Sequence, residues 1–497
     1  MAWWLVGLAL ALPWLTGALW VRGVWRDASA GVWPLALGYG YLLGSLAASL
    51  LLRLQAALGF RPSVIGPLSV LAALALMGGW LAWRQARRVD RLDLSANRLE
   101  RSWCEQPFWQ RALFALLLAW LGWRLAGLAQ EIWWRPLYPW DAWTTWTVRP
   151  RVWSELREWV PFVDPRRWLA DASGSVYAIE AWTYPATVPL LALWPTLAFG
   201  AWNETAANLP WFGAALALGF GFYGQARLWG AASLTALVFT WLSLSLPILN
   251  THVALAGYAD LWMALVFGLA AIAFFQWLRN GDRRQGILAL LLALACPLIK
   301  LEGAVWLSMF VPALLVVWLR GWSLWLMAGI AVVLGIVWWS VGGVTFNLPG
   351  WGWFRLRPDL IEVPYLGRFN LGYRGTWGPV LKNFFVLANW HLFWYLALVA
   401  VAVAVPGLPK ARWRSAAAVF VGSCLLMLFV LFFLTDAQRW AEQYTSINRV
   451  FLHFVPALLF WVMMVFVPSH PSCENGRQNR YSPSEAGPST GGEYPPV

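Results

Sequence analysis

The chain has 497 residues, of which 60% are hydrophobic and only 12% are charged. Because a soluble globular protein carries about a quarter charged residues, this composition excludes an ordinary soluble domain and predicts a membrane protein. The net charge of +13 does not indicate a nucleic-acid partner, since the Arg residues stand in short clusters between apolar segments. The four Cys residues show neither paired nor metal-ligand spacing, so no disulfide framework or zinc site is predicted.

Apolar segments of about 20 residues, the length that crosses a hydrocarbon core of roughly 30 Å, recur along nearly the whole chain. The first begins at Met1 with no preceding basic residue and no small-residue cleavage site, so it is interpreted as a retained transmembrane helix. The sequence therefore predicts an all-α fold, a polytopic transmembrane bundle of about 13 spans. Their expected positions are near residues 1–21, 32–52, 62–83, 108–129, 206–224, 230–250, 260–278, 284–300, 302–319, 322–341, 389–407, 415–434 and 449–467.

A cluster of six Arg residues lies between the third and fourth spans, in residues 84–107, and it indicates the sidedness, because short loops rich in Arg stay in the cytoplasm. The next loop, residues 131–183, is then extracytoplasmic. The apolar segment 184–202 contains three Pro residues, and if it crossed the membrane, three later basic loops would fall outside. We therefore expect an interfacial or re-entrant element there, with a tilted or broken span as the alternative.

The order of the spans also predicts the side of the membrane on which two later segments lie. Loop 341–389 is extracytoplasmic and carries more basic than acidic residues, an excess that would suit an anionic phosphate. The tail, residues 468–497, is rich in Pro, Ser and Gly and is expected to be a disordered cytoplasmic extension. The expected location is a bacterial cytoplasmic (inner) membrane, with the polar functional groups facing the periplasm or exterior.

The strongest local pattern is an acid among aromatic residues just after the fourth span. Asp141 stands between Trp140 and Trp143, with Arg149 close behind. A partly desolvated carboxylate could accept a hydrogen bond from a sugar hydroxyl and take its proton as a general base, while the Trp faces could stack on sugar rings. The alternative is that the Trp residues form an interfacial belt and that Asp141 caps a helix.

A second acid, Asp260, stands two residues after Tyr258 at the outer lip of an otherwise apolar span. An ionisable group in that position is a functional candidate by default. It could position an acceptor hydroxyl, or hold a divalent cation, Mg or Mn, jointly with Asp141. Whether a metal takes part is left open, since two carboxylates alone make a sparse site for a hard cation. The alternative for Asp260 is a helix N-cap.

Two more polar groups lie on the same side. Lys300 and Glu302 stand where a short hairpin meets the outer surface, and Lys300 could bind a phosphate as a point charge, or form only an interfacial ion pair. Asn448 and Arg449 open the last span, where Arg449 could be a second phosphate ligand or a structural Arg that reaches the interface. His453, on the same face, is expected to be a hydrogen-bonded packing residue.

In their order along the chain these blocks resemble the GT-C class of polytopic glycosyltransferases, which includes protein mannosyltransferases and the aminoarabinose transferases of lipid A. In that class an essential acid lies in the first large extracytoplasmic loop, matched here by Asp141. A Tyr-Pro or His-Pro-Pro motif follows, matched by Tyr184 and Pro185, and a second acid stands at the outer end of a span, matched by Asp260. The remaining blocks that look like those of bacterial members are Lys300, Glu302, Asn448 and Arg449.

The resemblance covers residues 108–467 and implies a GT-C-like catalytic domain there, preceded by three additional transmembrane helices in residues 1–83. It implies an inverting glycosyltransferase that moves a sugar from a polyprenyl-phosphate-linked donor to a lipid, glycan or protein acceptor at the extracytoplasmic face. Asp141 and Asp260 would be catalytic. The residues expected to bind substrate are Trp140, Trp143, Arg149, Tyr184, Tyr258, Lys300, Glu302, Asn448 and Arg449.

Two other functions compete with this interpretation. A transporter or flippase of a lipid-linked or anionic substrate would also need intramembrane charges, although it would be expected to bury them near the bilayer midplane. A non-catalytic membrane scaffold would use the Trp residues as anchors and the acids as caps, and it predicts that Asp141 can become Asn without loss of function.

Overall fold

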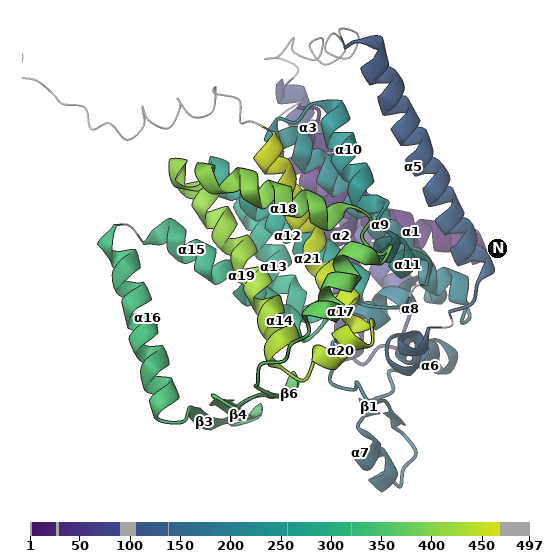
Figure 1. The fold of residues 1–497 in the computed structure, drawn as a ribbon. Helices are drawn as coiled ribbons and strands as arrows, with labels where there is room; N and C mark the ends of the chain where they lie inside the picture. The colour runs from purple at the N-terminus through teal and green to yellow at the C-terminus, as the bar shows by residue number, and fades with distance from the viewer. Residues whose placement is uncertain are drawn as a thin grey trace, which may run out of the picture.

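The computed structural model describes residues 2–25, 29–89, 106–137, 139–255, 257–319 and 321–467. Most of the expected cytoplasmic loop 84–107 lies outside these residues, and so do the expected tail 468–497 and Tyr138. The described chain is mainly helical, and Figure 1 shows most of the helices gathered into one bundle.

The helices that precede residue 260 are α1 (Ala2–Val24), α2 (Val32–Ala57), α3 (Ile65–Val89), α5 (Phe108–Trp134), α6 (Val148–Leu156), α7 (Pro165–Ala170), α8 (Thr187–Phe199), α9 (Glu204–Trp229), α10 (Ser233–Leu244) and α11 (Pro247–Ala254). Those that follow are α12 (Asp260–Asn280), α13 (Arg283–Ile299), α14 (Gly303–Ser308), α15 (Phe310–Trp318), α16 (Trp322–Ser340), α17 (Trp377–Leu381), α18 (Phe393–Ala404), α19 (Arg412–Leu434), α20 (Gln438–Glu442) and α21 (Ser446–Phe466). Three irregular helical turns are η1 (Ala142–Trp146), η2 (Lys382–Val386) and η3 (Val405–Lys410).

Fewer helices meet the requirements of a membrane span than the sequence predicted. In the described chain eight are long and apolar enough, namely α1, α2, α3, α5, α12, α16, α19 and α21, or nine if the bent pair α10 and α11 counts as one broken span. The expectation of about 13 spans is therefore corrected to eight or nine. Helices do form in the other expected segments, but most are short: α18, for example, has 12 residues and extends only about 18 Å. The protein is an integral multi-pass membrane protein.

Two small sheets correct the expectation of an all-α fold. In loop 131–183, β1 (Phe162–Val163) pairs in parallel with β2 (Tyr177–Ala178). In loop 341–389, β3 (Val344–Leu348), β4 (Gly352–Arg357), β5 (Leu360–Val363) and β6 (Gly367–Asn370) form an antiparallel meander in chain order. Short runs of β-branched and aromatic residues separated by Gly, Pro and Asp explain this meander, because such runs favour strands and such residues favour tight turns.

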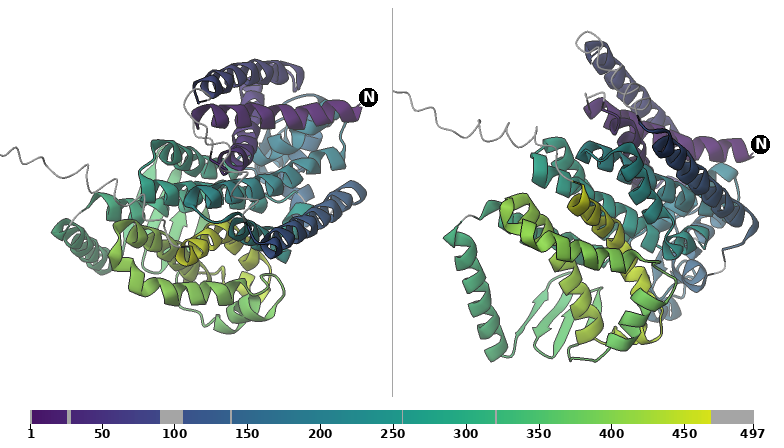
Figure 2. Two further views of the ribbon diagram at one scale, coloured as in Figure 1. Left: turned by 90° about the horizontal axis from the view of Figure 1, so that it is seen from above. Right: turned by 45° about the horizontal axis from the view of Figure 1, so that its top comes forward.

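The N-terminal helices pack closely into the bundle through glycines. A Cβ added at Gly17 of α1 would lie 2.0 Å from the Gly40 carbonyl oxygen of α2, and one added at Gly38 would lie 2.2 Å from the Gly221 nitrogen of α9. Small residues allow this close approach in a membrane, where packing replaces the hydrophobic effect as the driving force. Figure 2, seen from above, shows α1 to α3 on one side of the bundle and α18 and α19 on the opposite side.

Helix α12 lies at the centre of the bundle, since 18 of its 21 residues are buried. Its first residue is Asp260. Figure 1 shows α6, α7, the four-stranded sheet and α20 gathered at the bottom of the view. Helix α16 is the opposite case, because none of its 19 described residues is buried. It stands apart from the bundle in Figure 1, above strands β3 and β4.

Candidate functional site

Asp260 is the centre of a buried charge cluster. Its side chain is 1% exposed, and both carboxylate oxygens have partners. Oδ1 lies 3.1 Å from Lys300 Nζ and 2.9 Å from His453 Nε2, while Oδ2 accepts from Nε and Nη2 of Arg449, both at 2.8 Å. Three donor side chains from two separate segments, Lys300 at the end of α13 and Arg449 and His453 on α21, therefore converge on one acid. The alternative of a helix N-cap does not hold, because Ala259 occupies the N-cap position of α12 and the Asp260 oxygens face Lys300, His453 and Arg449, not a backbone N–H.

Arg449 joins the two acids that the sequence singled out. Its Nη1 lies 2.7 Å from Asp141 Oδ2, so the guanidinium bridges Asp141 and Asp260. The same guanidinium stacks over the Tyr258 ring at 4.3 Å. Asp141 differs from Asp260 in exposure, since its side chain is 33% accessible, and it too makes no cap hydrogen bond. The cluster therefore has one saturated, buried carboxylate and one that solvent or a substrate can reach.

Gly257 allows the two acid-bearing segments to meet. Its φ is +105°, a conformation that side-chain-bearing residues rarely adopt, and a Cβ there would lie 2.5 Å from Ala142 Cβ. Ala142 follows Asp141 directly, whereas Gly257 precedes Asp260 by three residues. The turn before α12 can therefore approach η1 closely only because residue 257 lacks a side chain.

Two histidines flank the buried acid. Trp306 Nε1 donates to His453 Nδ1 at 3.1 Å, which leaves Nε2 of the neutral ring to carry the proton and to donate to Asp260. His252 Nε2 lies 4.0 Å from Asp260 Oδ2, beyond hydrogen-bond distance. The expectation that His453 is a hydrogen-bonded packing residue is compatible with these contacts, and its place beside Asp260 also makes it part of the site.

Lys300, Glu302 and Tyr184 form the second half of the cluster. Lys300 Nζ lies 3.7 Å from Glu302 Oε1, and the Tyr184 hydroxyl donates to the same oxygen at 2.9 Å. Burial, and then the negative charge of Glu302, raise the pKa of Tyr184 above its usual value, so the phenol stays protonated as a donor. The other oxygen, Glu302 Oε2, is buried without a hydrogen-bond partner among the described residues.

A cavity of about 410 Å³ opens beside this half of the cluster. Its polar wall contains Tyr184, Lys300, Glu302 and His453, and strand β6 contributes Arg368. The apolar wall consists mainly of Ile361, Leu366, Met427, Val430, Leu431 and Val450. Arg368 is exposed and has no ion-pair partner among the residues that the structure describes. The cavity therefore combines a cationic end with a long apolar surface.

Other residues expected to bind substrate have different surroundings. Arg149 is buried and donates to the carbonyls of Ala181, Trp182 and Tyr184 at 2.7–2.9 Å, so it holds the turn that carries Tyr184. Burial, with a smaller repulsion from Arg53, lowers the pKa of Arg149 to about 10. Asn448 accepts from Trp390 and donates to Asn383, which places it in a structural network behind the acids.

Trp140 and Trp143 stand at the surface beside Asp141. They are 72% and 53% exposed, and their ring centroids are 6.2 Å apart. This arrangement leaves aromatic faces accessible next to the exposed carboxylate. It is compatible with stacking on a sugar and equally with contact to the membrane interface.

The two acids do not form a cation site in this arrangement. All the accepting capacity of Asp260 is directed at Lys300, His453 and Arg449, and Asp141 already faces Arg449. In the described part of the chain no group of three His, Cys, Asp or Glu residues is placed to hold a metal. The donor set therefore does not fit the divalent ion considered for Asp141 and Asp260.

Sequence reasoning missed two residues of the site. Trp306 was hidden in an apolar helix, and nothing in its local pattern distinguishes it from the other Trp residues. Arg368 was noticed only as part of a basic loop, although its place in a turn-rich, strand-forming segment was a usable signal.

Comparisons with protein-family models, with curated proteins and with solved structures find no match to this chain. The fold and the span count define it as a multi-pass helical membrane protein. Any finer function must come from the site itself.

Proposed function

We propose that the protein is a glycosyltransferase of the GT-C type, which moves a sugar from a polyprenyl-phosphate-linked donor to an acceptor at the extracytoplasmic face of the membrane. The observation that carries this proposal is the cavity with a cationic end and an apolar wall, whose Lys300 is linked through Asp260 and Arg449 to the accessible carboxylate of Asp141. The order of motifs along the chain supports it. The acceptor would be a lipid, a glycan or a protein.

The cavity suits the two ends of such a donor. Its apolar wall, drawn from α19, α21 and the sheet, would contact the prenyl chain where it enters from the membrane. Lys300 and Arg368 would contact the phosphate, because Lys acts as a point charge and Arg can grip two oxygens at once. Arg368 supports this role best, since its charge has no carboxylate partner in the described chain.

Asp141 is the proposed general base. The acceptor hydroxyl would give its proton to Asp141 while its oxygen forms a bond to the anomeric carbon, and the bond from that carbon to the phosphate oxygen breaks. The polyprenyl phosphate would leave with the electron pair and be stabilised by Lys300 and Arg368. Attack opposite the leaving group inverts the configuration of the sugar.

Arg449 takes a positioning role in this proposal. The sequence suggested it as a second phosphate ligand, but its guanidinium is held by Asp260 and Asp141. Asp260, fixed by Lys300 and His453, would anchor Arg449, which in turn orients Asp141. Asp260 would therefore act on catalysis through Arg449.

The placement of charge favours an enzyme over a carrier. A transporter or flippase is expected to keep ionisable groups near the bilayer midplane. Here Asp260 and Lys300 lie at the ends of α12 and α13, Arg449 lies in the first turn of α21, and Lys300 lines the cavity to which strand β6 contributes.

The test compares purified wild type with Asp141→Asn in nanodiscs, using radiolabelled polyprenyl-phosphate sugars as donors and membrane extract as acceptor. Asp164→Asn is the matched control, because it is the same substitution in the same loop, at a residue whose side chain only caps α7. Loss of general-base assistance should lower turnover about 10²- to 10⁴-fold in Asp141→Asn and leave Asp164→Asn unchanged.

Two results would contradict the proposal. Equal turnover in wild type and Asp141→Asn would remove Asp141 from the chemistry. Transfer of an intact lipid-linked sugar across a sealed vesicle, with no donor consumed, would instead identify a flippase.

A further inference from the structure

A second cavity lies at the opposite end of the bundle. Helix α12 begins with Asp260 and ends near Arg279, and its 21 residues extend about 30 Å. Likewise α21 begins beside Arg449 and ends beside Met464, which lines the second cavity. The two sites are therefore separated by the thickness of a membrane. The volume of the second cavity is about 110 Å³, enough for several water-sized groups.

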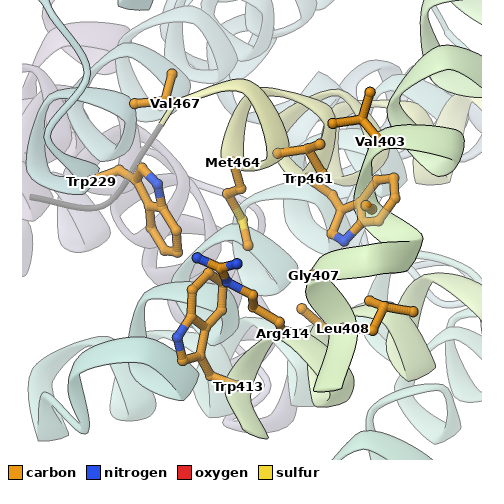
Figure 3. A pocket seen from close by; sticks show the side chains of 12 residues that line it. Trp229, Val403, Gly407, Leu408, Trp413, Arg414, Trp461, Met464 and Val467 are labelled. Atoms are coloured by element: carbon orange, nitrogen blue, oxygen red, sulfur yellow. The ribbon is translucent and has the colours of Figure 1, made fainter. Parts of the chain in front are cut away.

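The only charged residue that lines this cavity in the described chain is Arg414, in the first turn of α19. Figure 3 shows its side chain extending toward Trp229 and Met464. Its described contact is with the ring of Trp413, 5.2 Å from the guanidinium carbon, and it has no carboxylate partner there. Arg412 differs, because it donates to the carbonyls of Val316 and Leu319.

A second donor in the cavity wall also lacks an acceptor. Trp229 is 2% exposed, and its indole Nε1 is buried without a hydrogen-bond partner among the described residues. Buried polar groups nearly always have a hydrogen-bond partner, so a buried donor without an acceptor is unusual. Arg279 stacks on the Trp229 ring at 4.2 Å and adds positive charge nearby. An unpaired guanidinium and an unpaired indole N–H in one cavity favour an anionic acceptor.

The rest of the wall is apolar or aromatic, and it is formed by residues at the ends of α18, η3, α19 and α21. Val403, Leu408, Met464 and Val465 provide apolar contacts, while Trp413 and Trp461 are of the type that prefers the headgroup level of a bilayer. A soluble anion would gain nothing from these surfaces. An anion attached to acyl chains would contact them as well as the donors.

We propose that this cavity binds the phosphate of an anionic phospholipid, with Arg414 as its principal ligand and Trp229 Nε1 as a second donor. The site is independent of the proposed transferase activity, because none of its residues belongs to the cluster around Asp260. Its effect would be to attach the ends of α9, α19 and α21 to the headgroup layer.

The test uses the purified full chain and follows thermal unfolding during titration with short-chain phosphatidylglycerol, phosphatidylcholine or inorganic phosphate. Arg414→Gln removes the ligand, and Val403→Trp fills the cavity from an exposed position without changing its charge. Arg283→Gln is the matched control, because it removes one exposed Arg from the same end of the bundle but not from the cavity.

Wild type should bind phosphatidylglycerol more tightly than phosphatidylcholine. Arg414→Gln should weaken phosphatidylglycerol binding about ten-fold or more, because it removes a charge-assisted hydrogen bond. Val403→Trp should weaken binding about as much, because it fills the cavity, and Arg283→Gln should bind like wild type. If Arg414→Gln fails to fold in phosphatidylcholine nanodiscs, Val403→Trp decides the question. Unchanged affinity in the variants that fold, an equal loss in Arg283→Gln, or equal protection by inorganic phosphate would overturn the proposal.

Discussion

Trp306 orients His453 through a buried hydrogen bond of 3.1 Å, in which the indole Nε1 donates to Nδ1. Because Nδ1 is the acceptor, the neutral imidazole presents its N–H from Nε2 to Asp260 Oδ1, 2.9 Å away. The two residues lie 147 positions apart in the chain. One Trp in an apolar helix thus fixes the direction of a hydrogen bond in the charge cluster.

Replacing Trp306 by Phe should therefore do more than remove apolar area. The imidazole would lose the partner that sets its tautomer, and the bond to Asp260 would weaken. Leaving a buried acceptor unsatisfied costs about 1–3 kcal/mol. We expect a clear fall in the thermal midpoint in detergent for Trp306→Phe and little change for Trp377→Phe, since Trp377 is 49% exposed. Equal midpoints in the two variants would contradict this account.

Asp260→Asn should lower the stability of the folded protein far more than Asp141→Asn does. Removing the buried charge leaves Lys300 and Arg449 without their shared partner, and breaking a buried ion pair costs about 3–5 kcal/mol. Asp141 is partly exposed, and its loss leaves Arg449 still paired, so the cost should be about 1 kcal/mol or less. Thermal melts with size-exclusion profiles compare the two, and similar midpoints would refute the distinction.

Gly257→Ala should damage both stability and activity. The methyl group would meet Ala142 at a backbone conformation that Ala rarely adopts, which costs about 1–3 kcal/mol and pushes η1 away from α12. Gly378→Ala is the control, because a Cβ there meets nothing within 4 Å. The expected result is a lower midpoint and lost turnover for Gly257→Ala only. A wild-type rate in Gly257→Ala would show that the close approach of the two acids is dispensable.

Arg368→Gln should weaken donor binding without loss of stability. The side chain is exposed and without an ion-pair partner in the described chain, so its removal disturbs no packing. One lost charge-assisted contact to a phosphate should raise KM for the donor about ten-fold or more. Arg357→Gln changes the same residue type in the same sheet but breaks only an exposed pair with Asp359. If both variants raise KM equally, general attraction by the basic loop explains the effect.

Tyr184 should show no titration in the working pH range. Burial and the charge of Glu302 raise its pKa, so the folded protein favours the neutral phenol. The stabilisation from its bond to Glu302 is then present below the usual Tyr pKa of about 10 and is lost as pH rises from there toward the folded value. The ratio of wild-type to Tyr184→Phe rates should stay constant below about pH 10. A ratio that falls between pH 7 and 9 would contradict the assignment.

The sequence predicted the long spans and the ends at which the polar residues gather, because apolar length and Arg clusters carry that information locally. Asp141, Asp260, Lys300 and Arg449 were each noticed as polar interruptions at the edges of apolar segments. The structure brings these four together in one cluster. The sequence could suggest this proximity because it placed all four residues at helix ends on the same side of the membrane.

The partners within the cluster were beyond sequence reasoning. Arg449 was expected to face a phosphate and instead bridges two carboxylates, while Arg149 and Asn448 turn toward backbone and amide groups. These outcomes depend on how helices rotate about their axes during packing, which no local pattern specifies. The sheet at residues 344–370 was missed for a different reason, because the segment was judged by its charge and not by its alternating strand and turn residues.

The contact between Tyr39 and Leu269 bears on how the chain is made. The Tyr39 hydroxyl donates to a carbonyl that is 230 residues further along, and it accepts from Gln225 at 2.8 Å. At roughly 5–20 residues per second of synthesis, α2 would wait on the order of 10–50 seconds in the bilayer before α12 exists. During that interval its phenol and its row of small residues face lipid or an insertion partner. Assembly of this protein therefore involves a delay, because α2, the second helix to be made, contacts α12 only after half the chain has been translated.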